Sequence, residues 1–286
     1  MSEPANNEKH TAEGLRQVLV ARRGMVAAAA WLVVLALVLT AATFAWFSGS
    51  RFTNVTPVAH TVSEEGYDLL ISSSEGGPFD TQCTLAAADK TLYPVSTADL
   101  TSFWRATFQN ASGVTTDYAN CTSQLDEYAL TGTFYLKGSQ APLAVYLYQS
   151  QMSVSADLQL LAALRVGFVV QSQSGTHTYI FSCDDLGNTS QATSRRTTAQ
   201  DGVVVGGSGS WSYVSDPAQA IGARTMDGSG TTPVARAGAQ PLFTLAANEV
   251  ASVRYFVYME GCDVNCITEA QAKNLTLQFA FAGAKA

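Results

Sequence analysis

One uninterrupted apolar segment, residues 25–47, constrains this chain more than any other feature. Its 23 residues carry no charge, and as an α-helix they would span roughly 34 Å, enough to cross the hydrocarbon core of a bilayer. Arg22 and Arg23 stand directly before it, so the positive-inside rule holds the basic leader, residues 1–24, in the cytoplasm. The sequence therefore predicts one N-terminal transmembrane or signal-peptide helix, with everything after it exported.

The sequence leaves open whether this helix stays as an anchor or is removed. The apolar run is longer than the usual core of a signal peptide, yet Ala45 offers a small residue at a cleavage position, with Thr43 two residues before it. Cleavage between Ala45 and Trp46 by a signal peptidase would release an extracellular protein. Without cleavage, residues 25–47 would hold a single-pass protein at the cell surface with its N-terminus in the cytoplasm.

The exported part is acidic and rich in hydroxyl groups. From residue 48 on it has 12 Lys and Arg against 20 Asp and Glu, and the whole chain has 26 Ser and 29 Thr. Phosphate binding needs a basic stripe, so we expect no nucleic-acid partner. The negative charge would also keep the exported part off an anionic membrane surface.

Short segments of alternating or β-rich pattern, separated by Gly, Ser, Asn and Asp, predict an all-β sandwich. We interpret residues 63–286 as one domain, with an irregular excursion at about 187–238 in which Trp211 and Tyr213 predict a strand. Short helices are expected at residues 156–163 and 268–273. The expected strands are residues 67–73, 102–108, 128–137, 143–148, 164–171, 176–183, 253–260 and 275–281.

All five cysteines lie on the exported side, where disulfides can form. We expect Cys262 to pair with Cys266 in a small loop after a strand. Cys83 with Cys121 is the second predicted pair, which leaves Cys183 over. A redox pair or a zinc site is a weaker interpretation, because Cys-x-x-Cys spacing and paired His spacing are missing from the sequence.

The sequence offers few groups for catalysis. Beyond residue 47 the only histidines are His60 and His177, and neither belongs to a recognised catalytic motif. The sequence also has no nucleophile elbow, phosphate-binding loop or dinucleotide fingerprint. We therefore predict no catalytic residue, and a protein that is not an enzyme.

Glu260, Asp263 and Asn265 are the candidate metal ligands. They follow one another in a turn that could bring three oxygen ligands together for Ca²⁺. In the alternative interpretation Glu260 ends a strand, while Asp263 and Asn265 stabilise the turn through bonds from side chain to backbone. We expect no other cofactor.

Three blocks of sequence resemble a known family. They are residues 42–48, Ala-Thr-Phe-Ala-Trp-Phe-Ser; residues 164–168, Leu-Arg-Val-Gly-Phe; and residues 253–266 together with the closing strand to Phe281. In these blocks the chain resembles the camelysin/TasA-like secreted proteins of Gram-positive bacteria. The resemblance implies a jelly-roll sandwich that assembles into surface or matrix fibres by lending its N-terminal segment, here residues 48–62, as a strand to a neighbour. Some relatives are classed as metallopeptidases, but this sequence has no zinc motif.

Three functions follow as hypotheses. The first is a non-enzymatic cell-surface or matrix protein that associates with itself or with related subunits. The second is a membrane-anchored module that binds a glycan or a host protein through exposed aromatic residues, for which the candidates are Trp104, Tyr146, Tyr148 and Trp211. The third is a secreted hydrolase that uses a pair of carboxylates.

Overall fold

The structure is a computed structural model that describes residues 50–61, 68–83, 85, 90–109, 115–148, 153–155, 158–183, 202–207, 210–227, 234–235, 238–266 and 274–286. These residues belong to one compact unit, Ala45–Ala286. The predicted leader, the helix at 25–47, the cleavage site at Ala45 and Trp46 and the helix at 268–273 lie outside them. Among the described residues, no helix is long and apolar enough to cross a membrane.

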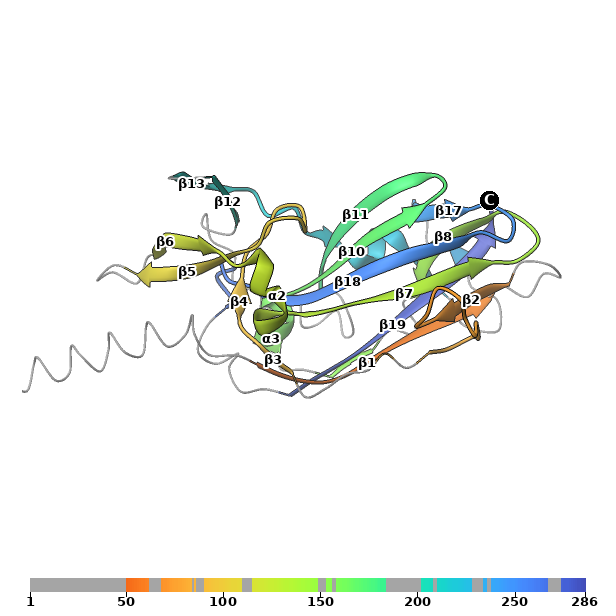
Figure 1. Ribbon diagram of the computed structural model, residues 1–286, viewed down its shortest axis with the longest axis horizontal. Helices are drawn as coiled ribbons and strands as arrows, with labels where there is room; N and C mark the ends of the chain where they lie inside the picture. Colours follow the sequence, from red (N-terminus) through yellow and green to blue (C-terminus); the bar gives the residue numbers. More distant parts are fainter. Residues whose placement is uncertain are drawn as a thin grey trace, which may run out of the picture. The chain divides into compact units, whose positions relative to one another are not determined.

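The fold of the described residues is all-β, as the sequence predicted, and two large sheets dominate it (Figure 1). The first sheet has eight strands in the order β16-β15-β8-β19-β1-β3, with β17 added on β8 and β9 on β19. Its strands are β1 (Ser50–Thr61), β3 (Lys90–Leu92), β8 (Leu143–Tyr148), β9 (Ser153–Ser155), β15 (Thr225–Asp227), β16 (Val234–Ala235), β17 (Phe243–Leu245) and β19 (Asn274–Lys285).

The second sheet has seven strands in the order β14-β11-β10-β18-β7-β2, with β4 added on β18. Figure 1 shows β11, β10, β18 and β7 side by side, and their pairings are antiparallel. Its strands are β2 (Leu69–Ser72), β4 (Pro94–Val95), β7 (Leu130–Gly138), β10 (Leu164–Ser172), β11 (Gly175–Ser182), β14 (Gln219–Ala220) and β18 (Val250–Glu260). Two hairpins complete the strands: β5 (Trp104–Gln109) with β6 (Thr115–Asn120), and β12 (Val203–Gly207) with β13 (Ser210–Val214).

The main core lies between the two sheets, because alternate residues of both contribute to it. On β18 these are Val253, Tyr255, Val257 and Met259, as the alternating pattern predicted. Rings from both sheets meet there: Phe168 of β10 packs edge-to-face on Phe279 of β19, with centroids 5.2 Å apart. Burial of one such side chain contributes about 1.5–3 kcal/mol.

A second core covers part of the outer face of the second sheet. Phe256 and Tyr258 of β18 are buried there beneath Phe103, which stacks on the first ring at 5.6 Å and meets the second edge-on at 5.7 Å. The alternation in β18 predicted only one buried face. The second face is buried because the residues before β5 and those around α2 (Leu125–Tyr128) fold over it.

Close packing against this second core accounts for the glycine at position 167. Leu100 adopts a left-handed backbone with φ 61° and presses its side chain onto Gly167 of β10. A Cβ atom on Gly167 would come within 2.6 Å of Leu100 Cδ1, so Leu100 would have to shift to admit any side chain. Packing therefore favours the glycine in Leu-Arg-Val-Gly-Phe.

Most expected elements are confirmed, with small shifts at their ends. α3 (Leu158–Ala163) lies within the predicted helix at 156–163, and β13 contains Trp211 and Tyr213 as expected. β7 begins at Leu130 and not at residue 128, because α2 precedes it. The excursion at 187–238 is more regular than expected: its described part contains β12 to β16 and the 3₁₀ helix at Ile221–Arg224.

The extended segment predicted at 48–62 forms β1, which joins the two ends of the exported part. β1 runs parallel to the last strand, β19, from Arg51 opposite Asn274 to Thr61 opposite Gly283. On its other side β1 pairs with β3 through Ser50–Phe52 alone.

Candidate functional site: a buried arginine and its carboxylates

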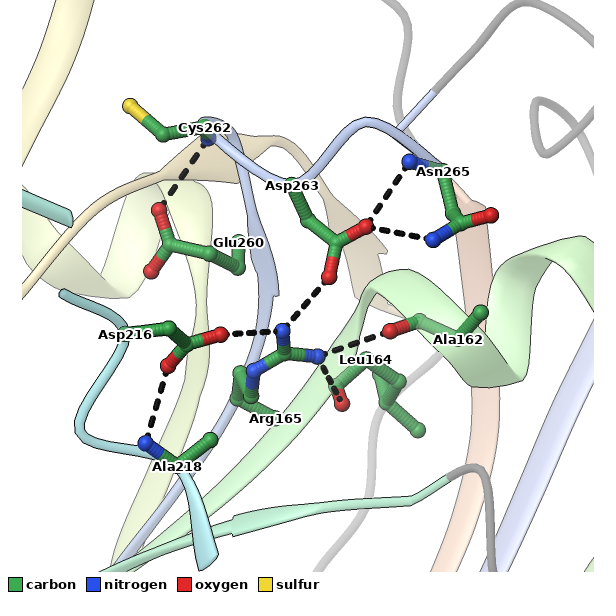
Figure 2. A network of polar contacts seen from close by, with 9 residues as sticks. All are labelled: Ala162, Leu164, Arg165, Asp216, Ala218, Glu260, Cys262, Asp263 and Asn265. Carbon is green, nitrogen blue, oxygen red and sulfur yellow. Dashed lines mark hydrogen bonds and ion pairs between the residues drawn. The ribbon is translucent and has the colours of Figure 1, made fainter. Parts of the chain in front are cut away.

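Arg165, the second residue of β10, is the centre of a buried polar cluster (Figure 2). Its side chain is fully buried, and its Nη2 atom lies 2.6 Å from Asp216 Oδ2 and 2.6 Å from Asp263 Oδ2. Nη1 donates hydrogen bonds to the backbone carbonyls of Ala162, at 2.7 Å, and Leu164, at 3.1 Å. The guanidinium thus binds three separate segments: β10 with the end of α3, the residues after β13, and the turn after β18.

The positive charge of Arg165 and the negative charges of Asp216 and Asp263 stabilise one another in the buried cluster. Burial alone would lower the pKa of Arg165, but the carboxylates of Asp216 and Asp263 outweigh it and raise this pKa above its ordinary value. Removing one member of such a buried ion pair leaves an uncompensated charge, which costs about 3–5 kcal/mol. Because Asp216 is 14% exposed and Asp263 is fully buried, Asp263 is the partner whose loss should cost more.

Glu260, the last residue of β18, lies beside this cluster with a fully buried side chain. Its Oε1 atom accepts a hydrogen bond from the backbone N–H of Cys262 at 3.1 Å. Burial raises the pKa of Glu260 to about 8, although a hydrogen bond with Ser96 and the charge of Arg165 act in the opposite direction. Glu260 therefore carries a proton at neutral pH.

Three buried polar atoms of this cluster make no hydrogen bond to the described residues: Arg165 Nε, Tyr258 Oη and Glu260 Oε2. All three side chains lie on one face of the second sheet, because Tyr258 is opposite Arg165 in the register and Glu260 follows two residues later. Such buried, unsatisfied groups reduce stability. The cluster joins chain segments, and nearly all its polar groups are buried away from any substrate, so its chemistry is that of a structural link.

The structure brings together the candidate calcium ligands, Glu260, Asp263 and Asn265, but in the roles of the alternative interpretation. Asp263 Oδ1 accepts hydrogen bonds from the backbone N–H of Asn265, at 2.7 Å, and from its Nδ2, at 2.8 Å. Asp263 Oδ2 is bound to Arg165. Within the described ranges, no group of three or more His, Cys, Asp or Glu is placed to hold a metal, and the calcium site stays a prediction.

All five cysteines are among the described residues, and no disulfide joins them in this structure. Cys83 and Cys266 pack against the main core, whereas Cys121 belongs to the second core. Burial raises the pKa of the Cys83 and Cys121 thiols to about 11, so both are protonated and poor nucleophiles at neutral pH. The pairs Cys262–Cys266 and Cys83–Cys121 stay predictions.

Of the aromatic residues proposed for ligand binding, the three whose side chains the structure describes do not share one exposed face. Trp104 packs its ring against Gly206, where a Cβ atom would come within 2.6 Å of the ring. Tyr148 is buried and Tyr146 is half-buried, both in a small cluster on the first sheet. The side chain of Trp211 lies outside the described part of the structure.

Arg165 and Asp216 are the two charged members of the cluster that the sequence did not identify. Arg165 had a signal, because a charge within the otherwise apolar run Leu-Arg-Val-Gly-Phe-Val-Val must be paired if the strand is buried. Asp216 had none, since an Asp before a proline is typical of any loop. Comparisons with protein-family models, curated proteins and solved structures return no match for this chain.

Proposed function

We propose that this protein is an exported, non-enzymatic structural protein of the cell surface or extracellular matrix, built as one jelly-roll-like sandwich that associates with further copies by exchanging β1. The observation that carries the proposal is the pairing of β1 with β19. The predicted export segment and the resemblance to camelysin/TasA-like proteins agree with it. No reaction centre is assigned, and the buried Arg165 cluster serves stability.

The position of β1 makes exchange inexpensive. It forms ten register pairs with β19 but only three with β3. β1 of one copy could replace that of another and rebuild the same pairs, which is the usual reason that exchange of an identical element has a low cost. A copy that has given up its β1 would expose the edge of β19, which would gain a full ladder from an incoming strand.

The low charge of the exported part also favours association. It has 32 ionisable acidic and basic residues, 12 plus 20, in the 239 residues from Ser48 on, so repulsion between copies is weak. Removal of residues 25–47 would determine where the protein acts. The cleaved protein would act in the matrix, and the uncleaved protein would act at the membrane surface.

An assembly assay on purified protein that begins at Trp46 tests this function. We expect it to form oligomers or fibres, seen by light scattering and electron microscopy, because its β1 is free to exchange. An excess of a peptide of residues 50–61 should cap the exposed edges and shorten the assemblies, whereas a scrambled peptide should not. Protein that stays monomeric at every concentration, with no fibres, would contradict the assembly proposal.

A further inference from the structure

A groove of about 430 Å³ lies on the outer face of the second sheet, next to the second core. Side chains of β7, β10 and β18 form its floor and the residues around Thr101 form one wall. Among the residues that line it are Thr101, Thr133, Gln171, Ser252, Arg254 and Phe256. This groove is separate from the buried Arg165 cluster, whose members do not line it.

Arg254 is the charged group of this groove. Its guanidinium lies over the ring of Phe256 at 4.8 Å from the centroid, and Phe103 stacks on the same ring at 5.6 Å. Stacking restricts the guanidinium, so its planar fork of donors is prepared for a ligand. Among the described residues, both ion pairs belong to Arg165, and Arg254 faces the groove without a carboxylate. Its planar guanidinium is suited to a two-pronged contact with a ligand carboxylate, which acts at short range against the net charge of −7 of the chain.

The remaining groups of the groove fit a ligand rich in hydroxyls. Thr101, Thr133 and Gln171 are exposed, and Ser252 is half-buried. The Thr101 hydroxyl donates to Asp99 Oδ2 at 2.6 Å and can accept a further hydrogen bond, whereas the other three side chains can both donate and accept. At Gln171, Ser252 and Arg254 the floor strands have a neighbour on each side, and their backbone groups are already used in these ladders. At Thr133, β7 pairs with β18, and its pairing with β2 covers only Tyr135–Gly138. An extended peptide binds through free backbone groups at a sheet edge, so this face favours a sugar over a peptide.

A second groove, of about 320 Å³, shares Gln171 and Ser252 with the first and so continues it along the sheet. It adds the half-buried ring of Tyr135, which offers a flat surface for a sugar. It also adds the carboxylate of Glu75, which would repel a negative charge. The two grooves together form one continuous track, which is cationic at the Arg254 end and acidic at the Tyr135 end.

From this arrangement we infer that the track binds an acidic polysaccharide, with a uronate carboxylate on Arg254 and the neighbouring uncharged sugar over Tyr135. Side-chain hydroxyls and the Gln171 amide bind the sugar hydroxyls between them. The inference is independent of strand exchange, because neither β1 nor β19 lines the track.

Calorimetric titration of the full chain in detergent micelles tests the inference. The probes are hyaluronan tetrasaccharide, in which uronate and neutral sugars alternate, and tetragalacturonate. We expect both to bind, and tetragalacturonate to bind more weakly, because its next sugar brings a second carboxylate toward Glu75. Methyl esterification of the carboxylates, or Arg254→Gln in the protein, should weaken binding by about tenfold or more. Arg254→Lys should recover part of it, since the charge remains and the fork is lost. Arg105→Gln is the matched control, because Arg105 also lies over a ring, that of Tyr128, but does not line the track; its binding should stay within about twofold of wild type.

Several results would overturn the inference. Equal binding of the ester and the acid would show that the ligand carboxylate does not contribute to binding. Unchanged binding by the Arg254→Gln protein, with the melting curve of the wild type, would show that Arg254 does not contribute. Failure of both acidic oligosaccharides to bind at millimolar concentration would exclude the ligand class. If pentaglutamate bound as tightly, with the same dependence on Arg254, the site would be one for acidic peptides.

Discussion

Two arginines on the same face of one sheet show how position decides what a charge does. Arg165 lies at one end of β10, fully buried, between two carboxylates. Arg254 lies on the neighbouring strand, opposite Val169, and is exposed on an aromatic ring. Each arginine has a neighbouring group that interacts with its positive charge. Arg165 is closed to solvent, so its interaction with the carboxylates contributes to stability. Arg254 is open to solvent and available to a ligand.

The largest expected effect is the loss of the buried arginine. Arg165→Met would leave Asp216 and Asp263 without their cation, and we expect the free energy of unfolding to fall by about 3–5 kcal/mol. Arg254→Met is the matched change on the open side and should alter stability by no more than about 0.5 kcal/mol. Urea unfolding followed by circular dichroism measures both. Equal effects of the two changes would contradict the comparison.

Replacing Asp263, which is closed to solvent, should destabilise the fold more than replacing Asp216, which is partly open to it. Asp263→Ala removes the fully buried partner together with its bonds to Asn265, and should cost about 3–5 kcal/mol. Asp216→Ala removes a partner that solvent already reaches, and should cost less. Chemical denaturation of the two variants decides the order, and a larger loss from Asp216→Ala would show that the turn at Asp263 is not the critical link.

Gly167→Ala tests the contact between the second core and the sheet. The new methyl group would meet the side chain of Leu100, and overpacking of this kind costs about 1–3 kcal/mol. Gly76→Ala is the control, since nothing lies within 4 Å of a Cβ atom at Gly76. Thermal unfolding of both variants measures the difference; a Gly167→Ala protein as stable as wild type would mean that Leu100 can move aside freely.

Glu260 should give stability a dependence on pH. Its pKa is raised by burial to about 8, above the value of about 4.3 expected in the unfolded chain. The folded state therefore binds the proton more tightly, so this contribution is fully present below pH 4.3 and is lost as the pH rises through about 8. Glu260→Gln should remove this loss. Unfolding measured between pH 4 and 9 tests it, and an unchanged pH profile in the variant would assign the dependence to other groups.

The sequence predicted the periodic parts of this molecule and missed those that depend on distant contacts. Alternation identified β10, β11, β18 and β19, because each places one face in the main core. It could not show that the other face of β18 is also buried, since the segments that cover Phe256 and Tyr258 are remote in sequence.

The same limit applies to the candidate site. The neighbours Glu260, Asp263 and Asn265 were found together because one turn holds them. Arg165, the partner of Asp263, is 98 residues before it, and only the register of the second sheet brings the two together. The partner of β1 was hidden for the same reason, because the pairing joins the two ends of the exported part.

The central proposal, exchange of β1 between copies, is tested most directly by a cross-link between β1 and β19. Thr56 and Gln278 are opposite each other in the register, so Thr56→Cys with Gln278→Cys can form a disulfide within one chain or between two. The control is Val169→Cys with Thr178→Cys, opposite each other in the β10–β11 hairpin, which should link only within a chain. We predict that oxidation gives chain-to-chain links for the first pair, increasing with protein concentration and located by mass spectrometry of the peptides. Links found only within single chains at every concentration would contradict strand exchange.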